Sequence, residues 1–86
     1  MYTIDQLEIL MLVAESDDPM ATALQIRRRW QYIMQVALGA VRGQVLDLSL
    51  PQVVRDHTIY ARKAQLILAA LDEWLEEHNH RKADAS

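Results

Sequence analysis

The chain has 86 residues, a net charge of −3 and no cysteine. This length fits one small domain, and the negative charge provides no overall basic field to favour DNA or an anionic membrane. The absence of cysteine excludes disulfides and thiolate chemistry and is compatible with a cytoplasmic location. Hydrophobic residues make up 51% of this short chain, and such a content often means that a second copy completes the core.

A first helix is predicted over residues 4–16. Thr3 and Gln6 form a capping-box pattern, because the hydroxyl can accept from the third helical N–H while the amide reaches back to the cap. Apolar residues occupy one face of this helix and also continue around it. That face holds Ile4, Leu7, Leu10, Met11 and Ala14, whereas Ile9, Leu12 and Val13 lie elsewhere on the helix.

A second helix is predicted over residues 19–46, beginning at Asp18 and Pro19. Aspartate is a favoured N-cap, and proline is tolerated at the first helical position because no N–H is needed there. Apolar or small residues recur three or four apart and define the packing side of this helix. These residues are Ala23, Ile26, Trp30, Ile33, Ala37 and Ala40.

A third helix is predicted over residues 50–80, with Ser49 and Gln52 as a second capping box. Its packing side is Val53, His57, Tyr60, Ala64, Ile67, Leu71 and Trp74. Because few residues separate the second and third helices, they should form an antiparallel hairpin. The first helix should fold back over the half that contains Trp30 and Leu71, and residues 81–86 should form a flexible tail.

The other half of this hairpin is expected to form a homodimer interface. The second helix is about 40 Å long and the first only about 20 Å, so the first helix cannot cover the whole hairpin. Gly39 and Gly43 each disfavour a helix interior by roughly 1 kcal/mol, so they either break the helix or let another backbone approach closely. We favour close approach, with an interface of Ala37, Gly39, Ala40, Val41, Gly43, Val54 and Tyr60.

A further apolar stripe on the third helix lies away from its packing side. It consists of Ile59, Leu66 and Ala70 and is bordered by Arg62, Lys63 and Glu73. An apolar strip with a charged border has the composition of a protein-binding face. We therefore expect an unidentified protein partner to bind there, unless the first helix folds over the same stripe.

The stretch ALQIRRRWQYIM, residues 23–34, combines three arginines with aromatic residues, as nucleic-acid-binding surfaces do. Successive helical residues turn by about 100°, so Arg27, Arg28 and Arg29 fan out instead of forming one basic face. In the hairpin they lie opposite Asp72, Glu73, Glu76 and Glu77, which favours a structural role. The alternative is a DNA-binding regulator that uses Arg28, Arg29, Arg55, Arg62 and Lys63, although no helix-turn-helix pattern is present.

No catalytic, cofactor-binding or metal-binding residues are predicted. His57 lies on the packing side of the third helix and should be a core or interface residue. Glu77 and His80 have a spacing found in carboxylate-bridged metal sites, but the first two helices supply no histidine to complete one. No nucleophile–base pair or phosphate-binding loop is recognisable, so we do not expect an enzyme.

The sequence thus predicts an all-α fold of three helices per subunit, assembled as a dimeric helical bundle. Its expected function is that of a small regulatory or adaptor protein that acts through protein–protein contacts in the cytoplasm. A phage virion or secretion-apparatus component is a further alternative. The N-terminus lacks a charged signal-peptide pattern, and apolar runs such as ILMLVA are too short to span a bilayer.

Overall fold

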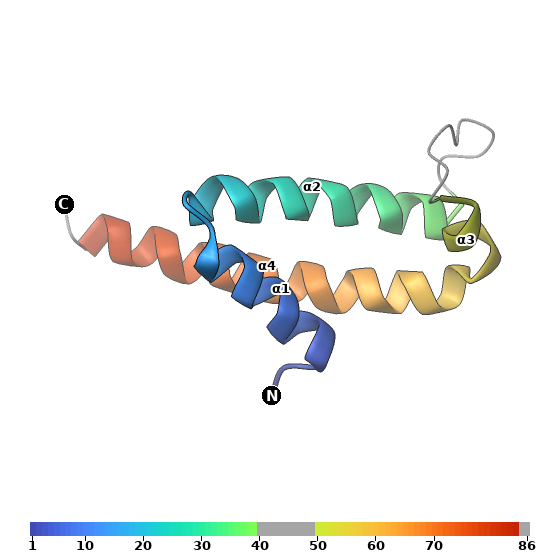
Figure 1. Ribbon diagram of the computed structural model, residues 1–86, viewed down its shortest axis with the longest axis horizontal. Coiled ribbons are helices and arrows are strands. Elements are labelled where there is room, and N and C mark those ends of the chain that lie inside the picture. The colour runs from blue at the N-terminus through green and yellow to red at the C-terminus, as the bar shows by residue number, and fades with distance from the viewer. Residues whose placement is uncertain (40–49, 85–86) are drawn as a thin grey trace.

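The computed structural model describes residues 1–39 and 50–84, with side chains except at positions 50, 51, 54 and 80–84, and is all-helical over them (Figure 1). Its helices are α1 (Ile4–Glu15), α2 (Pro19–Ala37), α3 (Leu50–Arg55) and α4 (His57–Asp84). The all-α prediction is therefore confirmed over this part of the chain. None of the described helices combines the length and apolar character needed to cross a lipid bilayer.

The starts of α1 and α2 match the capping patterns in the sequence. The Thr3 N–H donates to Gln6 Oε1 at 2.7 Å, and the Gln6 N–H donates to Thr3 Oγ1 at 3.2 Å, which completes the capping box. The Asp18 carboxylate accepts from the Ala21 N–H at 3.2 Å, with Pro19 as the first residue of α2. Both cap predictions are confirmed.

The end of α2 differs from the expected helix over 19–46. The helix stops at Ala37, and Gly39 takes a positive φ of 78° while its N–H donates to the Val36 carbonyl at 3.1 Å. A residue with a Cβ is disfavoured in this left-handed conformation, so glycine is the usual residue just beyond a helix end. The expectation that the helix continues through Gly39 is wrong, and Gly43 lies outside the described residues.

The predicted helix over 50–80 is present as two helices that meet at Asp56. Asp56 forms a backbone hydrogen bond with each helix: its N–H donates to the Gln52 carbonyl of α3, and its carbonyl accepts from the Tyr60 N–H of α4. In Figure 1, α3 turns away from the axis of α4 at one end of the molecule. At the other end, the last turns of α4 extend past the beginning of α2.

Two hydrophobic clusters join α2 to its neighbours along the molecule. Residues early in α2 lie beside residues late in α4, as the Arg27–Asp72 ion pair shows. The first cluster contains Ile33, Val36, Ala37 and Val53, and the second contains Val13, Ala23, Ile67 and Leu71. Trp30 packs against both clusters and links them. Because Val13 belongs to the second cluster, α1 covers the Trp30/Leu71 half, as predicted.

Candidate protein-binding surface

Several large apolar side chains of α1 point away from the rest of the protein, although Ile9 packs against the core. Ile4 is 76% exposed, Met11 59% and Leu12 57%, whereas Gln6 and Val13 are buried. We call the exposed residues Ile4, Leu7, Met11 and Leu12 the α1 outer face. Exposed apolar side chains are normal when scattered over a protein, but these four lie on a single twelve-residue helix.

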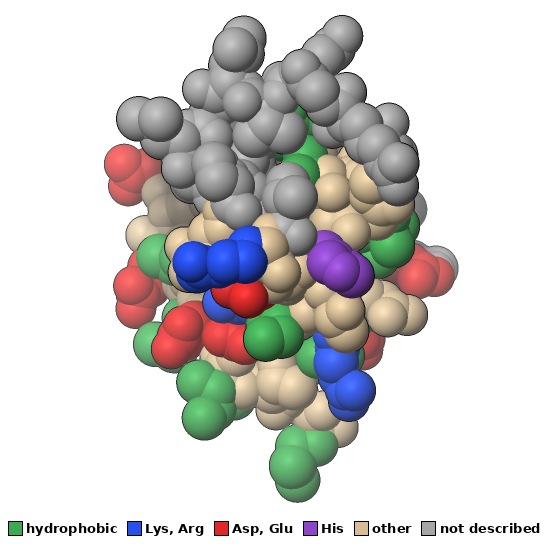
Figure 2. Space-filling view, turned by 90° about the vertical axis from the view of Figure 1, so that its right-hand side faces the viewer, with side chains coloured by type: hydrophobic (Ala, Val, Ile, Leu, Met, Phe, Trp, Pro, Cys, Tyr) green, Lys and Arg blue, Asp and Glu red, His purple; other side chains and the backbone are tan. Residues whose placement is uncertain are grey.

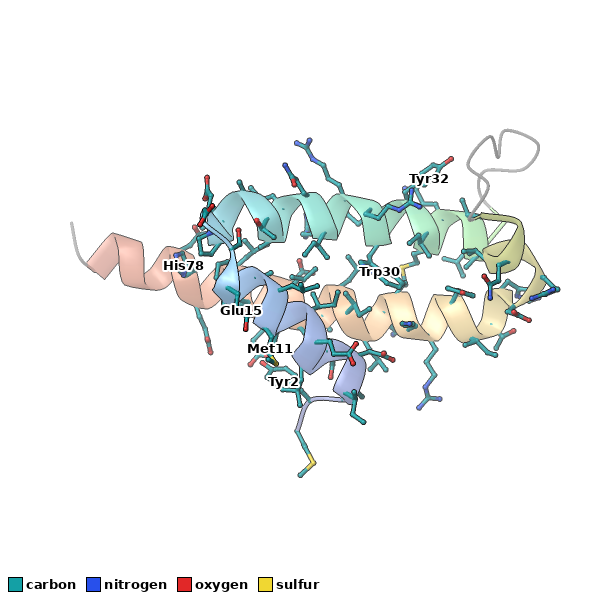
Figure 3. The ribbon with its side chains drawn as sticks, viewed as in Figure 1. Tyr2, Met11, Glu15, Trp30, Tyr32 and His78 are labelled. Carbon is teal, nitrogen blue, oxygen red and sulfur yellow. The ribbon has the colours of Figure 1, made fainter. Side chains whose placement is uncertain are left out.

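A shallow hollow lies on this helix beside the apolar side chains. Its volume is about 310 Å³, and its walls are Glu8, Met11, Leu12 and Glu15. Figure 3 shows Met11 and Glu15 on the same side of α1, with Tyr2 further along that side. The hollow thus brings apolar contact area and two carboxylates together within a few residues.

Tyr2 connects this side of α1 to acidic residues of α4. Its hydroxyl lies near the Glu73 carboxylate, and hydrogen bonding to this carboxylate is the main cause that raises the pKa of Tyr2. Partial desolvation and the negative charges of Glu73 and Glu77 raise that pKa further, because all of them oppose a tyrosinate. We call Glu8, Glu15, Glu73 and Glu77 the acidic rim. Among the described side chains, none of these four carboxylates forms an ion pair with a lysine or arginine.

Polar contacts fix the position of α1 and so the direction of its outer face. The Gln6 side-chain amide is buried and donates to the Leu66 carbonyl of α4 at 2.7 Å. Asp5 lies 3.8 Å from the Lys63 ammonium, and a hydrogen bond joins the hydroxyls of Ser16 and Thr22 at the turn into α2. With one face held in this way, α1 presents a defined surface to solvent.

The predicted partner-binding stripe on α4 is only partly accessible. Ile59 is 67% exposed, but Ala70 is 1% exposed and Leu66 is half-buried. The reason is that α1 packs on α4 here, as the bond from Gln6 to Leu66 shows. A partner can therefore reach Ile59 on the subunit described here, whereas Ala70 is buried within it.

The predicted dimer residues fall into three groups. Ala37 is buried within the subunit in the cluster with Ile33, Val36 and Val53, and Tyr60 packs against the same cluster. Gly39 forms the turn at the end of α2. Ala40, Val41 and Gly43 lie outside the described residues, as does the side chain of Val54. Leu38 is 68% exposed at this end of α2 and adds an apolar side chain that the sequence analysis did not include.

The basic residues are dispersed over the surface. Arg27 Nε lies 2.6 Å from Asp72 Oδ1, which is the pairing predicted from the hairpin register. Lys63 is paired with Asp5 and lies 5.7 Å from the ring centroid of Trp30, and Arg55 lies 3.6 Å from Asp56. The remaining candidates for nucleic-acid contact, Arg28, Arg29 and Arg62, are exposed on α2 and α4. Figure 2 shows basic and acidic side chains interspersed at the α3 end of the molecule.

The described histidines have different surroundings. His57 is exposed at the first position of α4, so it is not a core residue of the subunit, and its alternative place in an interface stays a prediction. It lies just after the turn at Asp56, near the end of the molecule where α2 has already ended. His78 stacks on Trp74 with ring centroids 4.5 Å apart. Within the described residues, no group of three potential metal ligands lies close together.

The α1 outer face and its acidic rim are the part of the described surface with the most distinctive chemistry. Methionine and leucine side chains provide apolar contact area, and carboxylates accept hydrogen bonds and attract cations. Such a surface can hold a group that is apolar on one side and positively charged at its edges. Comparison of the chain with protein-family models, with curated proteins and with solved structures finds no match.

Proposed function

We propose that this protein is a small, non-catalytic regulatory or adaptor protein of the cytoplasm that binds other proteins through its helix faces. The observation that carries the proposal is the α1 outer face, where Ile4, Met11 and Leu12 are each more than half exposed. Covering apolar surface contributes about 25 cal/mol for each Å² removed from water. A partner that covers these side chains therefore gains binding free energy from surface that the subunit leaves open.

The attachment of α1 supports this function, because a fixed surface binds with a smaller loss of conformational entropy. The buried Gln6 amide and the fully buried Val13 hold the inner side of the helix. The outer side chains are consequently presented by a backbone that is already ordered. This arrangement is the one expected of a docking surface that recognises a partner without large rearrangement.

Within this proposal, α2 and α4 form an antiparallel hairpin that dimerises near Gly39 and Tyr60. The exposed Leu38 supports a contact there, since a second copy would remove it from water. Light scattering at micromolar concentration should give about twice the 9.9 kDa mass of the chain. Leu38→Asp should give a monomer with unchanged helicity, and a monomeric parent protein would refute the dimer.

A cross-linking experiment tests the adaptor function itself. The photoreactive residue benzoylphenylalanine is placed at Met11 in cells of the native host, with Gln65 on another face of the protein as the matched control position. We expect a discrete protein adduct from position 11 and none from position 65. No adduct, or the same adducts from both positions, would count against binding through α1. Tight binding of the purified protein to a DNA duplex would favour the DNA-binding alternative.

A further inference from the structure

Charge is distributed unevenly along this chain. Residues 1–26 contain five acidic residues and no lysine or arginine, so all nine basic residues of the protein follow this segment. The five are Asp5, Glu8, Glu15, Asp17 and Asp18. The α1 outer face therefore lies in a segment whose charged side chains are all acidic.

The structure adds carboxylates from α4 to this acidic segment. Glu73 and Glu77 lie close enough to Tyr2 to raise its pKa, and Glu8 and Glu15 line the hollow beside Met11. Within the part of the chain whose side chains are described, no lysine or arginine is paired with these four residues. Carboxylates interspersed with apolar side chains on one surface select a ligand that carries both apolar anchors and positive charges.

We propose that the α1 outer face binds a positively charged amphipathic helix from a partner protein. The proposal rests on the adaptor function above and specifies the chemistry of its partner. The apolar anchors of such a helix contact Met11 and Leu12, and its lysines or arginines lie beside Glu8 and Glu15. At 1.5 Å per residue α1 is about 18 Å long, so a partner helix of three to four turns matches it.

A second copy of the same chain is a poorer occupant of this face. A symmetric contact between two α1 helices would bring Glu8 and Glu15 of each copy towards the same carboxylates of the other. Like charges brought together in this way oppose association. An anionic membrane is disfavoured for the same reason, because its surface carries the same sign of charge as the acidic rim.

Synthetic peptides provide a direct test. The probe is a fluorescent amphipathic peptide of about 14 residues with leucines three or four apart and lysines elsewhere. A second peptide replaces every lysine with glutamate, and a third scrambles the lysine peptide. Fluorescence anisotropy should show binding of the lysine peptide only, weakened by added salt. NMR shift changes on labelled protein should centre on Met11 and Leu12.

Matched charge reversals locate the contact. Glu8→Lys should weaken lysine-peptide binding by about tenfold, whereas Glu76→Lys makes the same charge change on exposed α4 surface and should leave binding unchanged. The double variant Glu8→Lys with Glu15→Lys should reverse the preference towards the glutamate peptide. Circular dichroism establishes that each variant remains helical before it is compared.

The outcomes separate this inference from the proposed function. Equal effects of Glu8→Lys and Glu76→Lys would mean that only net charge matters, and shift changes away from α1 would place the contact elsewhere. Either result overturns the proposal, as does failure of the lysine peptide to bind. If binding fails but Met11 still gives a specific cross-linked partner in cells, the adaptor function stands and the basic helix is the wrong partner class. If the lysine peptide does not bind and position 11 gives no specific cross-linked partner, both proposals are refuted.

Discussion

Helices α1 and α2 are both rich in apolar residues, but they use them in opposite ways. In α2 the buried residues are Ala23, Ile33, Val36 and Ala37, which lie on the side that faces the rest of the protein. In α1 one of the two buried residues is the polar Gln6, while larger apolar side chains face water. The comparison shows that the burial of a side chain on α1 is decided by how the helix is anchored and not by hydrophobicity alone.

The largest expected difference between these regions concerns truncation of apolar side chains. Leu71 is fully buried where α1, α2 and α4 meet, so Leu71→Ala should lower the free energy of unfolding by about 2–5 kcal/mol. Met11→Ala removes a comparable volume from the α1 outer face and should change the free energy of unfolding by less than about 0.5 kcal/mol. Urea denaturation followed by circular dichroism measures both. Similar losses for the two variants would mean that the α1 outer face is buried in solution.

Replacing a single polar residue, Gln6, should weaken the attachment of α1 to α4. Gln6→Ala removes the bond to the Leu66 carbonyl and half of the capping box, and should cost about 1–2 kcal/mol of unfolding free energy. Gln25→Ala is the control, because Gln25 is exposed on α2. Thermal melts of the two variants should differ accordingly. If they coincide, the Gln6 amide does not hold α1 in place.

A smaller effect is expected from the ion pair between α2 and α4. Arg27 and Asp72 are both substantially exposed, with side-chain exposures of 36% and 55%, so solvent screens their attraction. Arg27→Ala should therefore cost no more than about 1 kcal/mol, and less in high salt. A double-mutant cycle with Asp72→Ala isolates the pair. A coupling energy well above this range would show that the pair organises the α2–α4 contact.

The smallest effect concerns Tyr2 and appears only at alkaline pH. Because the folded pKa of Tyr2 lies above its ordinary value of 10.0, the neutral phenol stabilises the folded state. That contribution is complete below the unfolded pKa and is lost as the pH rises through the raised folded pKa. The difference in stability between the parent protein and Tyr2→Phe should therefore shrink above pH 10.0. A difference that does not depend on pH would argue against the bond to Glu73.

Much of the α2–α4 packing could be predicted from the sequence, because apolar and polar residues separate clearly on these helices. Ala23, Ile33 and Ala37 of the predicted α2 packing side are buried, as are Val53, Ala64, Ile67 and Leu71 of the partner helices. The caps at Thr3 and Asp18 were also predictable, since each depends on a short local pattern. Predictions from local sequence are accurate where the same helix geometry satisfies both the capping or apolar pattern of the sequence and the packing of the side chains in the fold.

The α1 surface could not be predicted in this way, because apolar residues surround the helix and no single face stands out. Which side faces inward depends on the Gln6 amide, whose partner is a backbone carbonyl sixty positions away in the chain. Ala70 is buried within the subunit, so the stripe predicted from the sequence is only partly accessible. At Gly39, spacing alone could not distinguish a close backbone contact from a helix end.

The extension of α4 beyond α2 in Figure 1 has a consequence for hydrogen exchange. Amide protons around Ile67 and Leu71 lie in a segment packed on two sides, so their exchange requires disruption of the core. The last turns of α4 have no α2 beside them. The ring of Trp74 stacks on the ring of His78, and we expect this contact to limit how far the unwinding of the helix end extends. Exchange along this single helix should therefore be graded, with rapid opening at its C-terminal turns while the centre stays protected.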